Sequence, residues 1–304
     1  MSKQIKGNFL LLLTAIIWGT AFVSQSVGVD HIPPLAFNGI RSLLGAASLI
    51  PVIVLTDRTR KKQGTFNAQR NNKSFWAAGM VCGTALGVAS AFQTYALKFT
   101  TAGKCGFVTA LYILFVPIIG IALGKKLRKI IIFAVTLALF GMYFLCMYGD
   151  DMSINKGDVM TFICSLCFSV HILLIDHYSP KVDGVKLSCL QFLVAGVINC
   201  AGMIFTGIPS WTDISGCVTA ILYAGIMSCG IAYTLQILGQ KHTNPTVASI
   251  LMSFESVFAA IAGWIILGDS MTVNEVFGCV LMFAAIIIAQ LPEKKISNKI
   301  QTNV

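Results

Sequence analysis

Three ionisable side chains in this sequence lie well inside long apolar segments, where charge is least expected. They are Arg41, His171 and Glu255. An ionisable group inside a bilayer is costly, so by default it is either paired or functional. Glu255 lies about ten residues into its segment, which is ~15 Å deep at the rise of an α-helix. That depth is near the midplane of a bilayer ~30 Å thick.

Each of these side chains has a functional and a structural interpretation. Glu255 could bind a cationic group of a substrate or carry a coupling proton, or it could pair with Arg41. Arg41 lies ~9 Å deep at the helical rise. It could meet a substrate carboxylate or extend outward along its aliphatic stem. His171 could bind substrate or transfer protons, or it could be a buried neutral histidine with one hydrogen-bond partner.

Aromatic and amide side chains at similar depth could complete a binding site. Trp18 lies too deep to be an interfacial anchor, and Tyr112 lies at the depth of Glu255 in the other half of the chain. We expect substrate contacts from Trp18, Gln93, Tyr112, His171 and Glu255, and coupling or gating from Glu255 and Arg41. Further polar candidates, which could equally hydrogen-bond between helices, are Tyr95, Asn199 and Gln236.

The composition indicates what kind of fold must position these residues. Of 304 residues, 56% are hydrophobic and 11% are charged, and the mean hydropathy is +0.80. Soluble domains carry roughly 25% charged residues, so this chain has too few to cover a water-exposed surface. We predict an all-α membrane protein with no room for a soluble domain. Nearly all of the 10 cysteines lie in apolar segments, and we expect neither a metal site nor a cofactor.

Charged residues, Gly and Pro divide the chain into ten expected transmembrane helices. Their approximate bounds are 8–29, 35–55, 75–97, 103–124, 130–148, 157–177, 186–206, 216–238, 245–268 and 273–291. The first follows Lys3 and Lys6, as a signal peptide would, but its apolar run is too long and has no convincing cleavage site. We therefore interpret it as the first span.

The distribution of Lys and Arg among the connections predicts the orientation. With a cytoplasmic N-terminus nearly all of them fall on the inner side, as the positive-inside rule requires. The exceptions outside are Lys98, Lys104 and Lys156. We predict a multi-pass protein of the cell (inner) membrane with both termini cytoplasmic. The net charge of +10 then reflects orientation, and we expect no nucleic-acid partner.

Weak internal similarity divides the ten spans into two sets of five. Lys6-Gly7-Asn8 resembles Lys156-Gly157-Asp158, and a looser alignment further on places Tyr112 with Leu251. Because five is odd, two such sets must insert in opposite directions. We predict two inverted five-helix repeats, one over residues 1–149 and one over 150–304 that ends in a short cytoplasmic tail. Inverted repeats place a substrate site near the midplane between them.

Four stretches carry a resemblance to a known family. They are Ile17–Phe22, Pro34–Arg41, Phe107–Pro117 and Val247–Ala260. In this order they resemble the EamA-type transporters of the drug/metabolite transporter superfamily, over essentially the whole chain. Two departures are Glu255-Ser256, where the family often has Glu-Pro, and Gly268-Asp269, where it often has Gly-Glu. The first removes a proline that would bend the ninth span.

The resemblance implies export or exchange of small metabolites. We expect a secondary transporter that exports a small polar metabolite, an amino acid or a related zwitterionic or cationic compound, by alternating access. The proton is the candidate coupling ion, and the chain would act as a monomer or homodimer in the bilayer.

The alternatives are a membrane-embedded lipid-modifying enzyme and a channel or assembly subunit. The enzyme would need clustered acids or histidines near the interface, and a channel would need a dedicated polar filter. The only acidic cluster is external, and no filter is evident. We expect no enzymatic activity and no catalytic residue.

Overall fold

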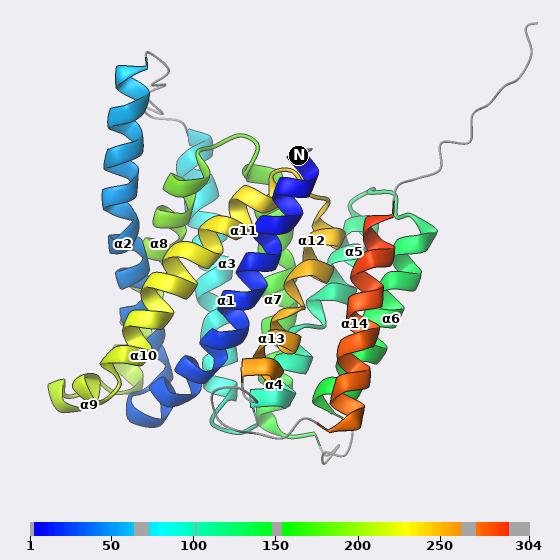
Figure 1. Ribbon diagram of the computed structural model, residues 1–304. Coiled ribbons are helices and arrows are strands. Elements are labelled where there is room, and N and C mark those ends of the chain that lie inside the picture. Colours follow the sequence, from blue (N-terminus) through cyan, green and yellow to red (C-terminus); the bar gives the residue numbers. More distant parts are fainter. Residues whose placement is uncertain (1–2, 64–72, 101, 148–153, 263–271, 292–304) are drawn as a thin grey trace, which may run out of the picture.

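The structure is a computed structural model that describes residues 3–63, 73–100, 102–147, 154–262 and 272–291 (Figure 1). These residues form helices and contain no strand. Within them, nine helical segments are long and apolar enough to cross a membrane, and a tenth, Lys129–Leu145, is apolar but shorter. The prediction of an all-α chain with ten spans is confirmed.

Most of the spans are single continuous helices. They are α1 (Lys3–His31), α2 (Pro34–Lys62), α3 (Lys73–Ala96), α6 (Lys129–Cys146), α7 (Lys156–Tyr178), α8 (Gly184–Thr206) and α14 (Val273–Gln290). Local sequence signals start several of them. Asn155 and Asp158 form a capping box at α7, and Pro34 occupies the first turn of α2, where its missing N–H costs no hydrogen bond.

The fourth and ninth spans are each interrupted by a two-residue break. The fourth consists of α4 (Ala102–Thr109) and α5 (Tyr112–Ala122), and the ninth of α12 (Pro245–Met252) and α13 (Glu255–Ala262). The ninth breaks although it lacks the proline usual in the family. Instead, the hydroxyls of Ser249 and Ser253 donate to carbonyl oxygens three residues earlier, at 2.8 and 2.9 Å. Such bonds compete with the helix's own hydrogen-bond ladder.

The eighth span contains a π-helix. After the short α9 (Trp211–Gly216), it consists of α10 (Val218–Leu222), η1 (Tyr223–Ala232) and α11 (Tyr233–Gln240). Its counterpart in the first half is α3, which is α-helical throughout. The i→i+5 hydrogen bonds of a π-helix fit one more residue into a turn than those of an α-helix do.

A one-residue difference in length between α3 and the eighth span accounts for this π-helix. An added Cβ on Gly83 would meet Val194 of α8, and one on Gly225 would meet Leu44 of α2. The two glycines therefore occupy matching places, and they are 142 residues apart. After the π-helix, the matching positions are 143 residues apart. Thr100 and Thr243, whose hydrogen bonds are described next, are one such pair. The second half thus holds one extra residue in this span.

Matching hydrogen bonds tie the starts of α1 and α7 to the bundle. Thr243 donates to Asn8 Oδ1 at 3.0 Å, and Thr100 donates to Asp158 Oδ1 at 2.9 Å. The acceptors are 150 residues apart and the donors 143. Figure 1 shows α1 and α7 beginning at opposite ends of the bundle. The two sets of five helices thus share local contacts and run in opposite directions; the predicted boundary at residues 149 and 150 lies outside the described residues.

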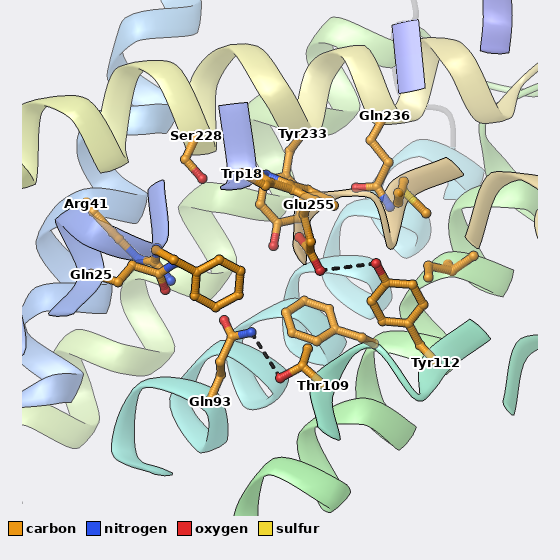
Figure 2. Close-up of a pocket in the computed structure, with 14 residues that line it drawn as sticks. Trp18, Gln25, Arg41, Gln93, Thr109, Tyr112, Ser228, Tyr233, Gln236 and Glu255 are labelled. Atoms are coloured by element: carbon orange, nitrogen blue, oxygen red, sulfur yellow. Dashed lines mark hydrogen bonds between the residues drawn. The ribbon is translucent and has the colours of Figure 1, made fainter. Parts of the chain in front are cut away.

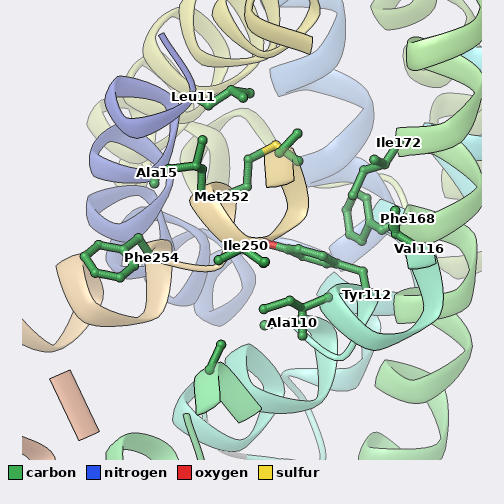
Figure 3. Packing of buried hydrophobic residues seen from close by; sticks show 14 of the residues in the cluster. Leu11, Ala15, Ala110, Tyr112, Val116, Phe168, Ile172, Ile250, Met252 and Phe254 are labelled. Carbon is green, nitrogen blue, oxygen red and sulfur yellow. The ribbon is translucent and has the colours of Figure 1, made fainter. Parts of the chain in front are cut away.

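The interior of the bundle is packed with apolar side chains, and its outer surface is apolar too. Leu11, Ile250, Met252 and Phe254 are almost fully buried in one cluster beside the break in the ninth span (Figure 3). Large side chains such as Phe133, which is 59% exposed, cover the outside. A surface of this kind suits contact with lipid, because lipid tails are as apolar as the side chains themselves.

Candidate functional site

A cavity lies inside the bundle and is lined from both sets of helices (Figure 2). Its polar lining residues are Gln25, Arg41, Gln93, Thr109, Tyr112, Ser228, Tyr233, Gln236 and Glu255. Its apolar walls are Trp18, Phe22, Phe168, Ile172 and Met252. The described residues hold no group of three or more His, Cys, Asp or Glu that could bind a metal ion.

Glu255 lies at the break in the ninth span and faces the break in the fourth. It is the first residue of α13 and is 5% exposed, and its Oε1 accepts a hydrogen bond from the hydroxyl of Tyr112 at 3.1 Å. Tyr112 is the first residue of α5. The interrupted helices therefore bring their two starting residues together across the middle of the molecule.

The packing of α1 fixes the position of this acidic residue. Gly19 lies against the start of α13, where an added Cβ would come within 2.7 Å of the carbonyl oxygen of Glu255. Any side chain larger than hydrogen would push α1 and α13 apart. The preceding residue, Trp18, lies in the cavity wall, and the centre of its ring is 4.6 Å from that of Tyr233.

Arg41 lies at the other end of the cavity in Figure 2. It is 6% exposed. Its Nε donates to Asn38 Oδ1 at 2.8 Å, and its guanidinium carbon lies 5.4 Å from the centre of the Phe37 ring. Among the described residues no ion pair joins Arg41 to Glu255, so the pairing considered from the sequence is not formed here.

Several polar atoms of the cavity wall are buried without a hydrogen-bond partner in the described part of the chain. They are Trp18 Nε1, Gln25 Oε1 and Gln236 Oε1. Gln93, by contrast, donates to Thr109 Oγ1 at 3.3 Å. Buried polar groups are normally satisfied by protein, water or ligand. The three unsatisfied atoms therefore mark a surface that can accept a polar molecule.

Many of the lining residues occupy matching places in the two halves. Two pairs are 150 residues apart and three are 143 apart, and they are Trp18/Phe168, Phe22/Ile172, Gln93/Gln236, Thr109/Met252 and Tyr112/Glu255. The spacing aligns Tyr112 with Glu255 and not with Leu251, so the loose sequence alignment was wrong there by four residues. Sequence identity in this region is too sparse to fix the register.

The structure brings together most of the residues singled out from the sequence. Trp18, Arg41, Gln93, Tyr112 and Glu255 all line the cavity. His171 is not among the lining residues. Its Nε2 lies 3.1 Å from Gln191 Oε1. Its ring lies edge-on to that of Tyr233, with 6.2 Å between the ring centres, so His171 lies behind Tyr233 as seen from the cavity.

Four polar lining residues were missed by sequence reasoning: Gln25, Thr109, Ser228 and Tyr233. A signal for the first exists, because Trp18, Phe22 and Gln25 are spaced i, i+4 and i+7 and must share a helix face. Gln236 was considered only as a general polar candidate. Ser228 and Tyr233 could not have been found, because the π-helix changes which face of the span they occupy.

Ten apolar helices around a central polar cavity, with interrupted helices at its wall, define a multi-pass membrane transporter built from two related halves. The comparisons with known proteins agree. The chain belongs to the EamA-like transporter family, whose model matches residues 5–147 and again residues 155–290. The double match fits the two sets of matching contacts described above.

Individual relatives are similar over most or part of the chain. An uncharacterized transporter of Archaeoglobus fulgidus is 27% identical over 290 residues, covering 95% of this chain and 87% of that protein. The threonine/homoserine exporter RhtA of Salmonella typhimurium is 23% identical over 169 residues, covering 55% and 57%. A solved crystal structure superimposes with a TM-score of 0.77 at 17% identity, over 94% of this chain and 97% of that one.

Proposed function

We propose that this transporter is a secondary exporter of a small polar metabolite, an amino acid or a related zwitterionic or cationic compound. The observation that supports this most directly is the hydrogen bond between Tyr112 and Glu255 at the two helix breaks. A substrate ammonium group can join the phenol hydroxyl as a second partner of the carboxylate, whose two oxygens accept several hydrogen bonds. A hydrogen bond in which the donor or the acceptor is charged is roughly twice as strong as a neutral one, and an ammonium also neutralises the carboxylate.

The walls of the cavity suit the same kind of substrate. Trp18 and Tyr233 present aromatic rings close to each other, and aromatic faces attract ammonium groups. Gln93 and Gln236 offer amides from matching places. His171, which lies behind Tyr233, contributes to substrate binding by supporting that ring.

Alternating access follows from the two inverted halves, 1–149 and 150–304, in this proposal. Two halves with matching contacts can exchange conformations, which opens the cavity first to one side and then to the other. The breaks in the fourth and ninth spans serve as hinges because their backbone lacks a continuous hydrogen-bond ladder. Glu255 couples the movement to a proton, and Arg41 gates the cavity. The bilayer surrounds the chain, which acts as a monomer or homodimer.

Both termini are cytoplasmic in this proposal. Figure 1 places the start of α1, the end of α2 and the α7–α8 connection at one end of the bundle. Ion pairs gather at that end: Arg60 with Asp183, Lys186 with Asp57 at 2.9 Å, and Lys125 with Asp176. A basic end of this kind faces the cytoplasm under the positive-inside rule. Export is supported by the similarity to RhtA, a threonine/homoserine exporter.

Counterflow in proteoliposomes tests this proposal. Vesicles that contain the purified chain are loaded with a mixture of unlabelled amino acids, and uptake of the labelled mixture is followed with and without a pH gradient. Saturable counterflow supports a carrier, and a response to the gradient supports proton coupling. Flux that never saturates would indicate a channel, and turnover of the vesicle lipids would indicate an enzyme.

A further inference from the structure

Arg41 is a buried cation that uses only part of its hydrogen-bonding capacity. A guanidinium carries five N–H donors, and in the described residues Arg41 makes one hydrogen bond, from Nε to Asn38. Figure 2 shows the side chain pointing from its helix toward the cavity. A buried charge without a partner is strongly unfavourable. The terminal nitrogens are not among the buried polar atoms that lack a partner, so they open onto the cavity that Arg41 lines, where an anionic or acceptor group can reach them.

Asn38 holds the guanidinium in this orientation. Its side chain is fully buried, and its Nδ2 donates to Ser90 O at 2.8 Å and to Thr94 Oγ1 at 2.7 Å. Both acceptors belong to α3, so the amide cannot rotate without losing two bonds. A rotated amide would also set an N–H group against the Nε–H of Arg41. The Asn38 oxygen is thereby fixed toward Nε, which leaves the opposite edge of the guanidinium for the cavity.

Neighbouring side chains add hydrogen-bond donors to those of the Arg41 guanidinium. Gln25 and Ser228 line the cavity at the Arg41 end in Figure 2, and each can donate a hydrogen bond. Glu255 lies nearer the middle of the cavity in Figure 2, and its partner Tyr112 lies at the end opposite Arg41. A planar carboxylate matches a guanidinium because two parallel N–H···O bonds form at once.

We propose that the Arg41 end of the cavity is a carboxylate-binding subsite, and that Asn38 is the positioning residue that presents the guanidinium to it. This inference rests on the proposed function, in which Glu255 binds the amine of the substrate. It narrows the substrate class from zwitterionic or cationic to zwitterionic. A transported molecule must carry a carboxylate and an ammonium group together.

Competition in the counterflow assay tests the subsite. The labelled amino-acid mixture is challenged with unlabelled amino acids, or with the primary amines that have the same side chains and no carboxylate. For the wild type we expect the amines to compete about tenfold less well or worse, which is the scale of a lost charge-assisted hydrogen bond. The variants Arg41→Gln and Asn38→Leu should lose this preference.

Asn199→Leu is the matched control. Asn199 is also a buried amide, 1% exposed, and it also bonds to α3, through Gly87 O at 3.2 Å. It does not line the cavity, so this variant should keep the preference for amino acids. If a variant loses counterflow altogether, a second measurement replaces the counterflow assay. It is the thermal stabilisation of the purified protein by the amino acids and by the primary amines. Amines should then stabilise Arg41→Gln as they do the wild type, and amino acids should do no better than amines.

Two results would contradict the inference, and they are distinguishable. Equal competition by amines and amino acids in the wild type, or a preference that survives in Arg41→Gln and Asn38→Leu, overturns the subsite and leaves the proposed function standing. Absence of both counterflow and stabilisation with either mixture overturns the proposed function, and the subsite with it.

Discussion

The two interrupted spans have the same local geometry and different chemistry. In each, an eight-residue helix ends, two residues follow, and a second helix begins. The second helix begins with Tyr112 in one span and with Glu255 in the other. Arg41 also differs from its counterpart, because the residue 150 positions later is the uncharged Gln191. The scaffold is thus duplicated, but each ionisable group of the cavity occurs in only one copy.

This difference shows how a symmetric fold can bind an asymmetric molecule. A cavity with identical halves would present the same group at both ends. Here the first half supplies the cation and the second half supplies the carboxylate. A small zwitterion has the matching polarity, and it can occupy the cavity in one orientation only.

The largest effect is expected from removing the charge that distinguishes the two breaks. Glu255→Gln keeps the size of the side chain and an acceptor for Tyr112, but it cannot neutralise a substrate ammonium group. We expect counterflow to fall roughly 100-fold, because breaking a buried ion pair costs ~3 kcal/mol or more. Glu275→Gln, on the exposed first turn of α14, is the matched control. Wild-type counterflow in Glu255→Gln would remove the main support for the role of the carboxylate.

A smaller loss is expected at the other break. Tyr112→Phe removes the hydroxyl that donates to Glu255 and leaves the ring in place. We expect counterflow to fall about tenfold, the scale of one hydrogen bond to a charged group. The double variant Tyr112→Glu with Glu255→Tyr moves the carboxylate to the first half. Recovery of counterflow in that variant would show that the two breaks are interchangeable, contrary to the asymmetry described above.

The packing behind the two breaks can be compared in the same way. Gly19→Ala places a Cβ against the backbone at the start of α13, and we expect a loss of about 1–3 kcal/mol in unfolding free energy, as for an overpacked core. The residue 150 positions later is Ser169, which already carries a side chain. Ser169→Ala should cost less than ~1 kcal/mol. Thermal unfolding in detergent measures both, and an equal cost at the two positions would contradict the comparison.

The smallest effect concerns the starts of α2 and α8, which begin after Pro33 and Asp183. Only Asp183 caps its helix with a side chain, accepting from the N–H groups of Val185 and Lys186. Burial opposes its charge, but these bonds and the Arg60 side chain outweigh burial and hold the pKa of Asp183 below its ordinary value. We expect Asp183→Ala to cost ~1 kcal/mol.

The pH dependence of that cost has a definite sign. A carboxylate with a lowered pKa in the folded state stabilises the fold above the unfolded pKa, which is about 3.9 for Asp. This contribution is lost as the pH falls through the folded pKa. The difference in unfolding temperature between wild type and Asp183→Ala should therefore shrink below about pH 4. Pro33→Ala should show no such change, and a constant difference for Asp183→Ala would exclude the carboxylate as its cause.

The spans were predictable, but the interruptions were not. A run of about 20 apolar residues must cross the bilayer, so composition alone locates the helices. The break at Ser253 and Phe254 has no proline or glycine to announce it. It depends on serine hydroxyls and on the backbone of α1 packed against it through Gly19, and neither contact can be seen in a single sequence.

The sequence predicted which residues lie at the depth of the cavity, but not which of their side chains face it. The depth of Arg41, Tyr112 and Glu255 along their spans identified them as candidates, and all three line the cavity. His171 lies at a comparable depth but turns toward Gln191 in α8. Depth follows from counting residues, whereas the direction of a side chain depends on how each helix is rotated against its neighbours.

The π-helix η1 has a consequence for how far the two halves can diverge from each other. A wide turn lets one copy of a duplicated gene gain a codon without moving the residues on either side of it. Gly225, which packs against α2 at the start of η1, and Gln236, which lines the cavity after it, both keep the places of their counterparts Gly83 and Gln93. The two copies can therefore differ in length by one residue while the helix packing and the cavity lining both keep their register.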